Sequence, residues 1–385
     1  MKLQPKNFYK DFKLGVLGGG QLGRMLIRSC LDLNVHTFVL DSDPNAPCKG
    51  FCDLFMLGNL NDFGTVYQFG KQVDLLTIEI ENVNVDALYL LEKEGVAVFP
   101  QASVVELVQD KGKQKEFYRK NNIPTADFHL IEHKIDLGKH QSFLPAIQKL
   151  RKAGYDGRGV YKLRHHEDIE DAFDAPSVLE KWADIHREIS VIVARNANGQ
   201  MTVFPTVELV FRPKENLVDY LFSPALIDAK TEAKAIEIAR TVADKLGIVG
   251  LLAVEMFVLN DGDVWVNEIA PRPHNSGHHT MEACHVSQYE QHLRAILNMP
   301  LGDTSLIAPA LMVNLLGEEG FEGPAHIEGI EKIFAMKGAH LHLYGKKYVK
   351  PARKMGHITL CDVPPTLAAE KAAEIKSMIQ VISKS

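Results

Sequence analysis

Between residues 13 and 100, short runs rich in β-branched and large apolar residues alternate with segments of helical character. The runs are Leu14 to Leu17, Val35 to Leu40, Leu75 to Ile80, and Val96 to Phe99. Parallel strands need a long crossover between them, usually a helix, so this alternation is typical of a parallel sheet. The pattern predicts an α/β domain over residues 1–108.

A glycine-rich turn follows the first of these runs. Gly18-Gly19-Gly20-Gln21-Leu22-Gly23 has the spacing GxGxxG between a predicted strand and a predicted helix, and Asp41 ends the next strand. This is the arrangement of a dinucleotide-binding turn, so an NAD-dependent oxidoreductase is one hypothesis. The same turn can hold any phosphate at a helix N-terminus, or simply pack a helix on a strand.

Length and charge narrow the class of protein. The chain has 385 residues, 46% of them apolar and 24% charged, which predicts two or three globular domains. A net charge of -6 argues against nucleic-acid binding. Residues 1–13 lack the apolar run of a secretory signal, and no stretch approaches the roughly 18 apolar residues that span a bilayer. Five scattered cysteines indicate reduced thiols, and we expect a cytoplasmic protein without membrane or nucleic-acid partners.

The rest of the chain has an α+β character. A lysine-rich stretch from Ser103 to Asn122 is predicted to be helical and to end before Pro124. Residues 128–182 are β-rich, and long strands dominate from Ile185 onward, with helices near Thr231 to Leu246 and after Pro365. We therefore predict a small domain over residues 109–184 and a larger one over residues 185–385.

Two apolar runs between Ala253 and Ala270 are joined by Asn260-Asp261-Gly262-Asp263. Asp-Gly is a preferred centre of a two-residue hairpin turn, and counting outward from it places Glu255 directly opposite Glu268. A three-residue turn would shift this register by one and break the pairing.

Two carboxylates on one face of a hairpin repel each other unless something compensates their charge. A magnesium ion would do so, because it takes oxygen ligands from one or two carboxylates and from substrate phosphates. The alternatives are two solvent-exposed glutamates, or a pair in which one carboxyl has a raised pKa. The spacing therefore predicts Glu255 and Glu268 as metal ligands.

A polar loop, PRPHNSGHH, follows the second strand of this hairpin over residues 271–279. Arg272 presents a planar fork of donors suited to an oxyanion, and His274 and Asn275 add further hydrogen-bonding groups. We predict an anion site here. A zinc site built from the three histidines, or a structural loop, is the alternative.

Two further segments point to phosphate binding. The loop GYDGRG over residues 154–159 can fold its backbone over phosphates, although a plain surface hairpin has the same composition. Near the C-terminus, basic side chains gather between residues 346 and 354. They predict a pocket for a substrate phosphate, or alternatively an edge strand protected by lysines.

Taken together, GGGQLGRM, AGYDGRG, VLEKW, REISV, AVEMFV and VNEIAPRPHNSGHHT closely resemble the 5-(carboxyamino)imidazole ribonucleotide synthases of the ATP-grasp superfamily. The resemblance covers nearly the whole chain, and NSGH is its most discriminating part. It implies an ATP-grasp fold preceded by a Rossmann-like parallel-sheet domain. It also implies ATP and two magnesium ions as cofactors, and a homodimer.

The resemblance assigns a site role to individual residues. The nucleotide-binding residues it implies are Lys111, Lys149, Gly154, Tyr155, Asp156, Gly157, Arg158, Gly159, Val160, Glu180, Lys181, Trp182, Ala183, Glu188, Asn267 and Glu268. Those implied for aminoimidazole ribonucleotide are Gln21, Tyr155, Asp156, Arg158, Lys347, Arg353 and Lys354. Those implied for catalysis, with bicarbonate on the first three, are Arg272, His274, Asn275, Asp156 and Arg158.

Two departures from the family pattern stand out. Ala153 replaces a glycine before the predicted flap over residues 154–160, and Leu209-Val210-Phe211 replaces an Asn-x-His. The first is expected to stiffen the flap, and the second removes a contact near the nucleotide.

The hypothesis for the reaction is that bicarbonate attacks the γ-phosphate of ATP and gives carboxyphosphate and ADP, after which the carboxyl group passes to the imidazole amine. Asp156 is expected to orient this amine or to take its proton. The nearest alternative is a formate-dependent glycinamide ribonucleotide transformylase, whose loop resembles PRPHDTG. Asn275-Ser276 favours bicarbonate.

Overall fold

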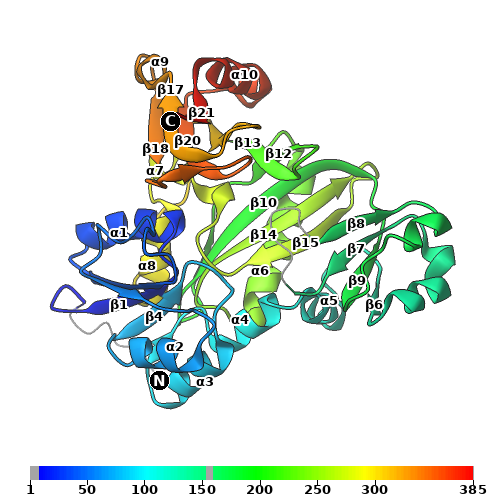
Figure 1. Ribbon diagram of the computed structural model, residues 1–385, viewed down its shortest axis with the longest axis horizontal. Coiled ribbons are helices and arrows are strands. Elements are labelled where there is room, and N and C mark those ends of the chain that lie inside the picture. Colours follow the sequence, from blue (N-terminus) through cyan, green and yellow to red (C-terminus); the bar gives the residue numbers. More distant parts are fainter. Residues whose placement is uncertain (1–7, 153–158, 385) are drawn as a thin grey trace.

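The computed structural model describes residues 8–152 and 159–384. Its N-terminal part is a parallel sheet in the order β3-β2-β1-β4-β5, flanked by helices (Figure 1). The strands are β1 (Lys13–Leu17), β2 (His36–Asp41), β3 (Leu54–Leu57), β4 (Leu75–Ile78) and β5 (Ala97–Val98). The helices are α1 (Gln21–Asp32), α2 (Phe63–Gly70), α3 (Val85–Lys93) and α4 (Ala102–Val108).

This sheet confirms the predicted parallel α/β pattern, with one strand more than predicted. The additional strand, β3, is short and lies at the edge of the sheet, where its side chains are only partly buried. An edge strand of four residues leaves little hydrophobic signal in a sequence because one of its sides and part of its faces remain in water.

The second unit is a small antiparallel sheet in the order β6-β9-β7-β8. Its strands are β6 (Phe128–Ile131), β7 (Ala146–Leu150), β8 (Val160–Leu163) and β9 (Ser177–Lys181). Beside it lie α5 (Lys111–Lys120) and the 3₁₀ helices η1 (Lys134–Phe143) and η2 (His166–Ile169). The single helical stretch predicted from Ser103 to Asn122 was wrong. Asp110 interrupts it and caps α5, where its carboxylate accepts a hydrogen bond from the amide of Gly112 at 2.8 Å.

A large antiparallel sheet in the order β15-β14-β10-β12-β13-β16-β20-β18 forms the centre of the molecule, and β11 pairs with β10. Its strands are β10 (Ile185–Arg195), β11 (Met201–Val203), β12 (Val207–Arg212), β13 (Leu217–Ser223), β14 (Gly250–Leu259), β15 (Val264–Ala270), β16 (Ala310–Leu316), β18 (Ala339–Leu343) and β20 (Lys354–Cys361).

The sheet has a buried face and a polar face because neighbouring residues of a strand point to opposite sides. On the buried face, Ile189, Val254 and Met256 pack against α6 (Ala229–Leu246). This helix begins at the cap Asp228 and ends at Gly247, which has a positive φ of 61°. The opposite face carries Glu255 and Ser190, and farther along the same two strands it buries Ile192 and Ala253 in a second core cluster.

The C-terminal part adds the small sheet β19-β17-β21 and covers the far end of the large sheet. Its elements are β17 (Gly323–Glu328), α9 (Ile330–Phe334), β19 (Tyr348–Val349), η4 (Pro365–Leu367), α10 (Ala368–Met378) and β21 (Gln380–Ser383). The helices predicted near Thr231 to Leu246 and after Pro365 are confirmed.

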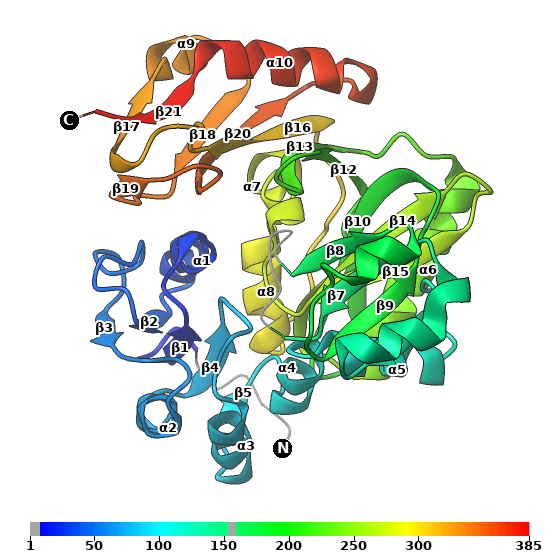
Figure 2. The same ribbon diagram turned by 45° about the vertical axis from the view of Figure 1, so that its right-hand side comes forward.

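One helix joins the first unit to the large sheet. Figure 2 shows α8 (Gln288–Ile296) between α1 and β14, preceded by η3 (Asn275–Gly277) and α7 (Thr280–Ala283). Tyr289 and Leu293 of α8 pack into the same core cluster as Leu26 of α1. Through α8, the N-terminal unit packs against the segment that follows the polar loop after β15.

Among the described residues, no helix is both long enough and apolar enough to cross a membrane. The five cysteines are free thiols. The domain limits at residues 108 and 184 stay a prediction.

Candidate active site

Glu255 and Glu268 lie opposite each other on β14 and β15, as predicted, but by a different route. The turn has three residues, not two, because Leu259 donates its amide to the carbonyl of Asp263 at 2.8 Å and Gly262 has a φ of 86°. Val258 therefore pairs with Val264, one residue out of the predicted register. The predicted two-residue turn was wrong.

A β-bulge restores the pairing. The register shifts between Met256, which faces Val266, and Glu255, which faces Glu268, so Asn267 is the additional residue. A bulge of this kind can re-aim the side chains beside it. Asn267 accepts a hydrogen bond from Nζ of Lys149 at 2.8 Å, and Glu268 lies 3.4 Å from Nζ of Lys111. The bulge thus presents two consecutive polar side chains to the site.

Three carboxylates share this face of the sheet. Burial, followed by the charges of Glu268 and Glu188, raises the pKa of Glu255 to about 8. Burial also raises the pKa of Glu188 to about 7, against the opposing effect of Lys149 and with a contribution from Glu268. Carboxylates crowded in this way repel one another. Glu255 and Glu268 offer two oxygen donors on one face, and magnesium is usually bound by one or two carboxylates together with substrate phosphates.

Lysines from two other elements face these carboxylates. Nζ of Lys149, on β7, lies 3.1 Å from Oε2 of Glu180, on β9. Lys111 begins α5, and the amide of Lys111 donates to the carbonyl of Arg151 at 2.9 Å. Lys149 and Lys111 thus reach Asn267 and Glu268 from the small sheet and from the start of α5.

Sequence reasoning missed Lys115. Its Nζ lies 3.3 Å from Oε2 of Glu180 and donates to Oγ1 of Thr125 at 2.6 Å, and the side chain is 3% exposed. Burial lowers the pKa of Lys115 to about 8, although Glu180 opposes this effect. A cavity of about 10 Å³ lies between these groups and Glu268. Lys115 is one of four lysines in its helix, so composition alone gives no signal for it.

The polar loop after β15 reaches the same site. Arg272 forms an ion pair with Glu81 at 2.9 Å, and Nε2 of His274 lies 3.5 Å from Oε1 of Glu255. Burial, then the charges of Arg272 and Lys354, lowers the pKa of His274 well below its ordinary value, so the imidazole is neutral. Nδ2 of Asn275 is buried without a hydrogen-bond acceptor among the described residues. A buried donor without a partner favours a bound ligand.

The alternative of a zinc site in this loop is not supported. The ring of His278 contacts Tyr289 and Gln288 at 3.0 and 3.3 Å, whereas that of His274 contacts Ser276 at 2.9 Å. In the part of the chain that the structure describes, no group of three or more histidine, cysteine or acidic side chains is placed to hold a metal ion.

The basic C-terminal segment lies between the first unit and the carboxylates. Lys354 is close enough to Glu255 and His274 to affect the pKa of both side chains. Nζ of Lys347 donates to Oδ1 of Asn45, in the loop after β2, at 2.8 Å. Arg353 donates to the carbonyl of Tyr348 at 2.7 Å. The fold therefore places Lys347 beside the loop after β2 and Lys354 near the carboxylates, although β18 rather than this segment forms the edge of the large sheet.

Two carboxylates of the protein itself accept hydrogen bonds from the amides of the glycine turn. The amide of Gly19 donates to Oδ2 of Asp41 at 2.5 Å, and that of Leu22 donates to Oε1 of Glu79 at 3.1 Å. A Cβ at Gly20 would collide with the carboxylate of Glu79. A carboxylate of the protein itself therefore occupies the N-terminus of α1, where a dinucleotide would place its phosphates. This argues against the alternative of a dinucleotide site. Sequence reasoning missed Glu79 because it lies 57 residues along the chain from Leu22.

Five of the predicted site residues lie outside the described residues: Gly154, Tyr155, Asp156, Gly157 and Arg158. Gly159 precedes β8, which begins at Val160; Lys181 ends β9, and Trp182 and Ala183 lie between β9 and β10. Gln21 is the first residue of α1 and is partly buried.

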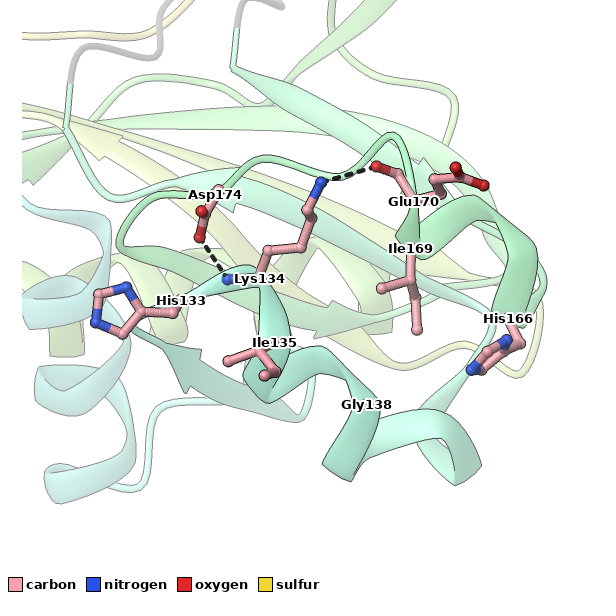
Figure 3. A pocket seen from close by; sticks show the side chains of 8 residues that line it. All are labelled: His133, Lys134, Ile135, Gly138, His166, Ile169, Glu170 and Asp174. Carbon is pink, nitrogen blue, oxygen red and sulfur yellow. Dashed lines mark hydrogen bonds between the residues drawn. The ribbon is translucent and has the colours of Figure 1, made fainter.

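A hollow of about 620 Å³ lies elsewhere, between η1 and η2 (Figure 3). Its residues are His133, Lys134, Ile135, Gly138, His166, Ile169, Glu170 and Asp174. Lys134 uses its amide to bond Asp174 and its Nζ to bond the carbonyl of Glu170, both at 2.8 Å. None of the predicted site residues lines this hollow.

Comparison with known sequences agrees with this arrangement. Family models match residues 12–109 (ribonucleotide synthetase preATP-grasp domain), residues 116–289 (ATP-grasp domain) and residues 310–371 (phosphoribosylaminoimidazole carboxylase C-terminal domain). The fold and the site thus define an ATP-grasp ligase with a preATP-grasp domain.

Individual relatives narrow the class. N5-carboxyaminoimidazole ribonucleotide synthase of Bacillus subtilis is 36% identical over 92% of this chain and 93% of its own length. Phosphoribosylaminoimidazole carboxylase of Vigna aconitifolia is 40% identical over 90% of this chain, which spans 63% of that protein. The chain belongs to the N5-carboxyaminoimidazole ribonucleotide synthase family.

Solved structures of this family have the same fold. The synthetase of Thermotoga maritima matches with a TM-score of 0.89 and 39% identity, over 97% of this chain and 100% of that one. The Aspergillus clavatus synthase in complex with ADP and 5-aminoimidazole ribonucleotide matches with a TM-score of 0.87 and 33% identity, over 96% of this chain and 99% of that one.

Proposed function

We propose that the protein uses ATP and bicarbonate to carboxylate the amine of 5-aminoimidazole ribonucleotide, a step of purine biosynthesis. The observation that carries this proposal is the pairing of Glu255 with Glu268 beside Lys111 and Lys149, with the Arg272 loop on the same face. Membership of the synthase family supports the same activity.

Lys111 and Lys149 are proposed to bind the phosphates of ATP. Both ammonium groups lie against Glu268 or its neighbour Asn267, so phosphate oxygens there would meet two positive charges. Glu255 and Glu268 would hold magnesium, which supplies positive charge to the phosphate oxygens and offsets the repulsion of the carboxylate pair. Glu188 and the segment 180–183 remain the proposed binding residues for the nucleoside.

The loop that contains Arg272, His274 and Asn275 is proposed to bind bicarbonate. The guanidinium of Arg272 supplies the positive charge for an anion, and the unused amide donor of Asn275 supplies a hydrogen bond. His274 is neutral at physiological pH, so it can donate one hydrogen bond without carrying a charge.

These positions support a two-step transfer. An oxygen of bicarbonate attacks the γ-phosphorus of ATP, the bond to ADP breaks, and carboxyphosphate forms, while Lys111 and Lys149 neutralise the charge that spreads over the phosphoryl group. The amine of the ribonucleotide then takes the carboxyl carbon, phosphate leaves and the nitrogen loses a proton. Lys347, Arg353 and Lys354 are proposed to hold the phosphate of the ribonucleotide. Asp156 and Arg158 keep their predicted roles.

The test is ADP release from the purified protein with each substrate omitted in turn. We expect turnover only when ATP, bicarbonate and 5-aminoimidazole ribonucleotide are all present. Turnover with formate and glycinamide ribonucleotide would favour the transformylase alternative. Reduction of NAD without ATP consumption would contradict the proposal altogether.

Magnesium has its own test. We expect EDTA to abolish ADP release and excess magnesium to restore it, because the two facing carboxylates would hold the ion against the phosphates of ATP. As a measurement independent of turnover, magnesium with ADP should raise the Tm of the wild-type protein more than that of a Glu268→Gln variant. Equal shifts in the two proteins would contradict the assignment of Glu268.

A homodimer and a cytoplasmic location are also proposed, on the resemblance and on the cysteine pattern. Size-exclusion chromatography with light scattering checks the first. A mass of one chain, 42.9 kDa, would contradict it.

A further inference from the structure

The peptide groups of His274 are bonded on both sides by one side chain. The amide of His274 donates to Oε1 of Gln288 at 2.8 Å, and Nε2 of Gln288 donates to the carbonyl of His274 at 2.8 Å. Gln288 is the first residue of α8 and is 0% exposed. The side-chain amide of Gln288 therefore bonds the backbone of this loop as a neighbouring β-strand would.

Gln288 is itself fixed from two directions. Its backbone amide donates to Oγ1 of Thr280 at 2.9 Å, and the same hydroxyl donates to the carbonyl of Gly277 at 2.5 Å. A Cβ at Gly277 would lie only 2.5 Å from Cδ of Gln288. Gly277 is thus required for the loop to pack against this side chain, and the side chain of Gln288 has little freedom to move.

The two hydrogen bonds from Gln288 fix the backbone of His274 and thereby the position of its imidazole. Nδ1 of this ring accepts a hydrogen bond from the amide of Ser276 at 3.3 Å, so the proton of the neutral ring is on Nε2, which faces Oε1 of Glu255 at 3.5 Å. Oγ of Ser276 contacts both Nδ1 of His274 and Oγ of Ser190, each at 2.9 Å. The loop is therefore tied to β10 and aligned with the carboxylate pair.

We propose that Gln288 is a positioning residue that holds the Arg272 to Gly277 loop in its anion-binding conformation and thereby sets the affinity for bicarbonate. The inference rests on the proposed function of this loop. Among the described residues, the side chain of Gln288 forms hydrogen bonds with His274 and His278 and with neither the carboxylate pair nor Lys111 or Lys149, so we expect its effect to be confined to the anion side of the site.

The same helix provides a matched control. Gln291 is also 0% exposed, and its side-chain amide makes the same pair of bonds to Gly302, donating to the carbonyl at 3.1 Å and accepting from the amide at 3.0 Å. Gly302 belongs to the loop between α8 and β16, away from the site residues. Substitution of either glutamine by methionine removes two buried hydrogen bonds to peptide groups and keeps the length of the side chain; in Gln288 it also removes the 3.3 Å contact with His278.

The experiment compares Gln288→Met with Gln291→Met. Both variants should lower the Tm by a similar amount, because each leaves two buried peptide groups without partners. We expect Gln288→Met to raise the KM for bicarbonate at least tenfold while the KM for ATP stays within twofold. Gln291→Met should leave both values within twofold. Equal bicarbonate KM values in the two variants would overturn the inference.

A milder variant covers the case in which Gln288→Met does not fold. Thr280→Val keeps both side-chain bonds of Gln288 but removes the hydroxyl that fixes its backbone, and we expect a threefold to fivefold rise in the KM for bicarbonate. An unchanged KM would overturn the inference. Failure of the proposed function is distinguishable, because ADP release by the wild-type protein would then not depend on bicarbonate at all.

Discussion

Glu255 and Glu268 show what a single pair of side chains contributes. The two carboxylates face each other across neighbouring strands, where like charges destabilise a sheet. The raised pKa of Glu255 reflects burial and this repulsion. Such a pair lowers stability unless a positive charge offsets the repulsion, and Nζ of Lys111 lies 3.4 Å from Glu268.

Replacing one member of the pair separates function from stability. We expect Glu268→Gln to lower kcat for ADP release at least 100-fold, whereas the free energy of unfolding stays constant or rises by up to about 1 kcal/mol, because one repelling charge is removed. Kinetics and urea unfolding measure the two effects.

The matched control is Asp263→Asn in the same hairpin, an exposed carboxylate that pairs with Lys234 at 2.7 Å. It should leave kcat unchanged. A Glu268→Gln variant with wild-type activity would remove Glu268 from the site.

At the scale of elements, the start of α5 links a helix cap to a site lysine. The carboxylate of Asp110 caps the helix and also pairs with Arg151 through two bonds, at 2.9 and 2.8 Å. Burial raises the pKa of Asp110, but the bonds from Arg151 and from the helix amides exceed this effect and lower it below its ordinary value. Lys111 follows directly, so this cap sets the position of the lysine that pairs with Glu268.

The cap and the ion pair can be separated because asparagine caps helices about as well as aspartate. We expect Asp110→Asn to lower the free energy of unfolding by about 2 kcal/mol, the contribution of hydrogen bonds to a charged group, and to raise the KM for ATP. Thermal or urea unfolding and ADP-release kinetics measure both.

Asp228→Asn at the start of α6 is the control for this prediction. Asp228 caps its helix through the amides of Lys230 and Thr231 and forms no ion pair with any residue that the structure describes, so the loss should stay below about 0.5 kcal/mol. Equal losses of unfolding free energy in the two variants would show that the helix cap, and not the ion pair with Arg151, accounts for the contribution of Asp110 to stability.

Across the whole molecule, buried histidines join the units. Nε2 of His292, on α8, lies 3.0 Å from Oγ1 of Thr77, on β4. The rings of His278 and His357 stack with centroids 4.7 Å apart, between the loop before α7 and β20. Burial lowers the pKa of His292 to about 3 and that of His279 to about 4. All four side chains are buried in the folded protein.

These shifts predict sensitivity to acid. Below about pH 6.5 the unfolded chain binds protons that the folded protein excludes, so stability is complete above this pH and falls as the pH decreases towards the folded pKa values. Each such histidine contributes up to about 1.4 kcal/mol per pH unit. We expect His292→Gln to reduce the pH dependence of the free energy of unfolding between pH 6 and 4 by about this amount.

Urea unfolding at several pH values measures this slope. His285→Gln serves as the control because His285 is exposed, and its slope should match that of the wild type. An unchanged slope in His292→Gln would contradict the assignment of a buried neutral imidazole at this position.

Much of the fold follows from local patterns in the sequence. Strand and helix periodicity predicted the parallel sheet and α6, and the Asp-Gly turn located the hairpin, because these features depend on neighbouring residues. The alternation of side chains also predicted that Glu255 and Glu268 share a face. The edge strand β3 and the break at Asp110 left weaker local signals and were missed.

Only the tertiary structure decided which distant groups meet. The bulge at Asn267 compensates for a three-residue turn, and no count outward from the turn reveals two irregularities that cancel. Glu79 reaches the glycine turn, and Gln288 reaches His274, through packing between elements far apart in the chain. Spacing determines the period and the turns, whereas the partners of a buried polar group depend on how the sheets and α8 pack together.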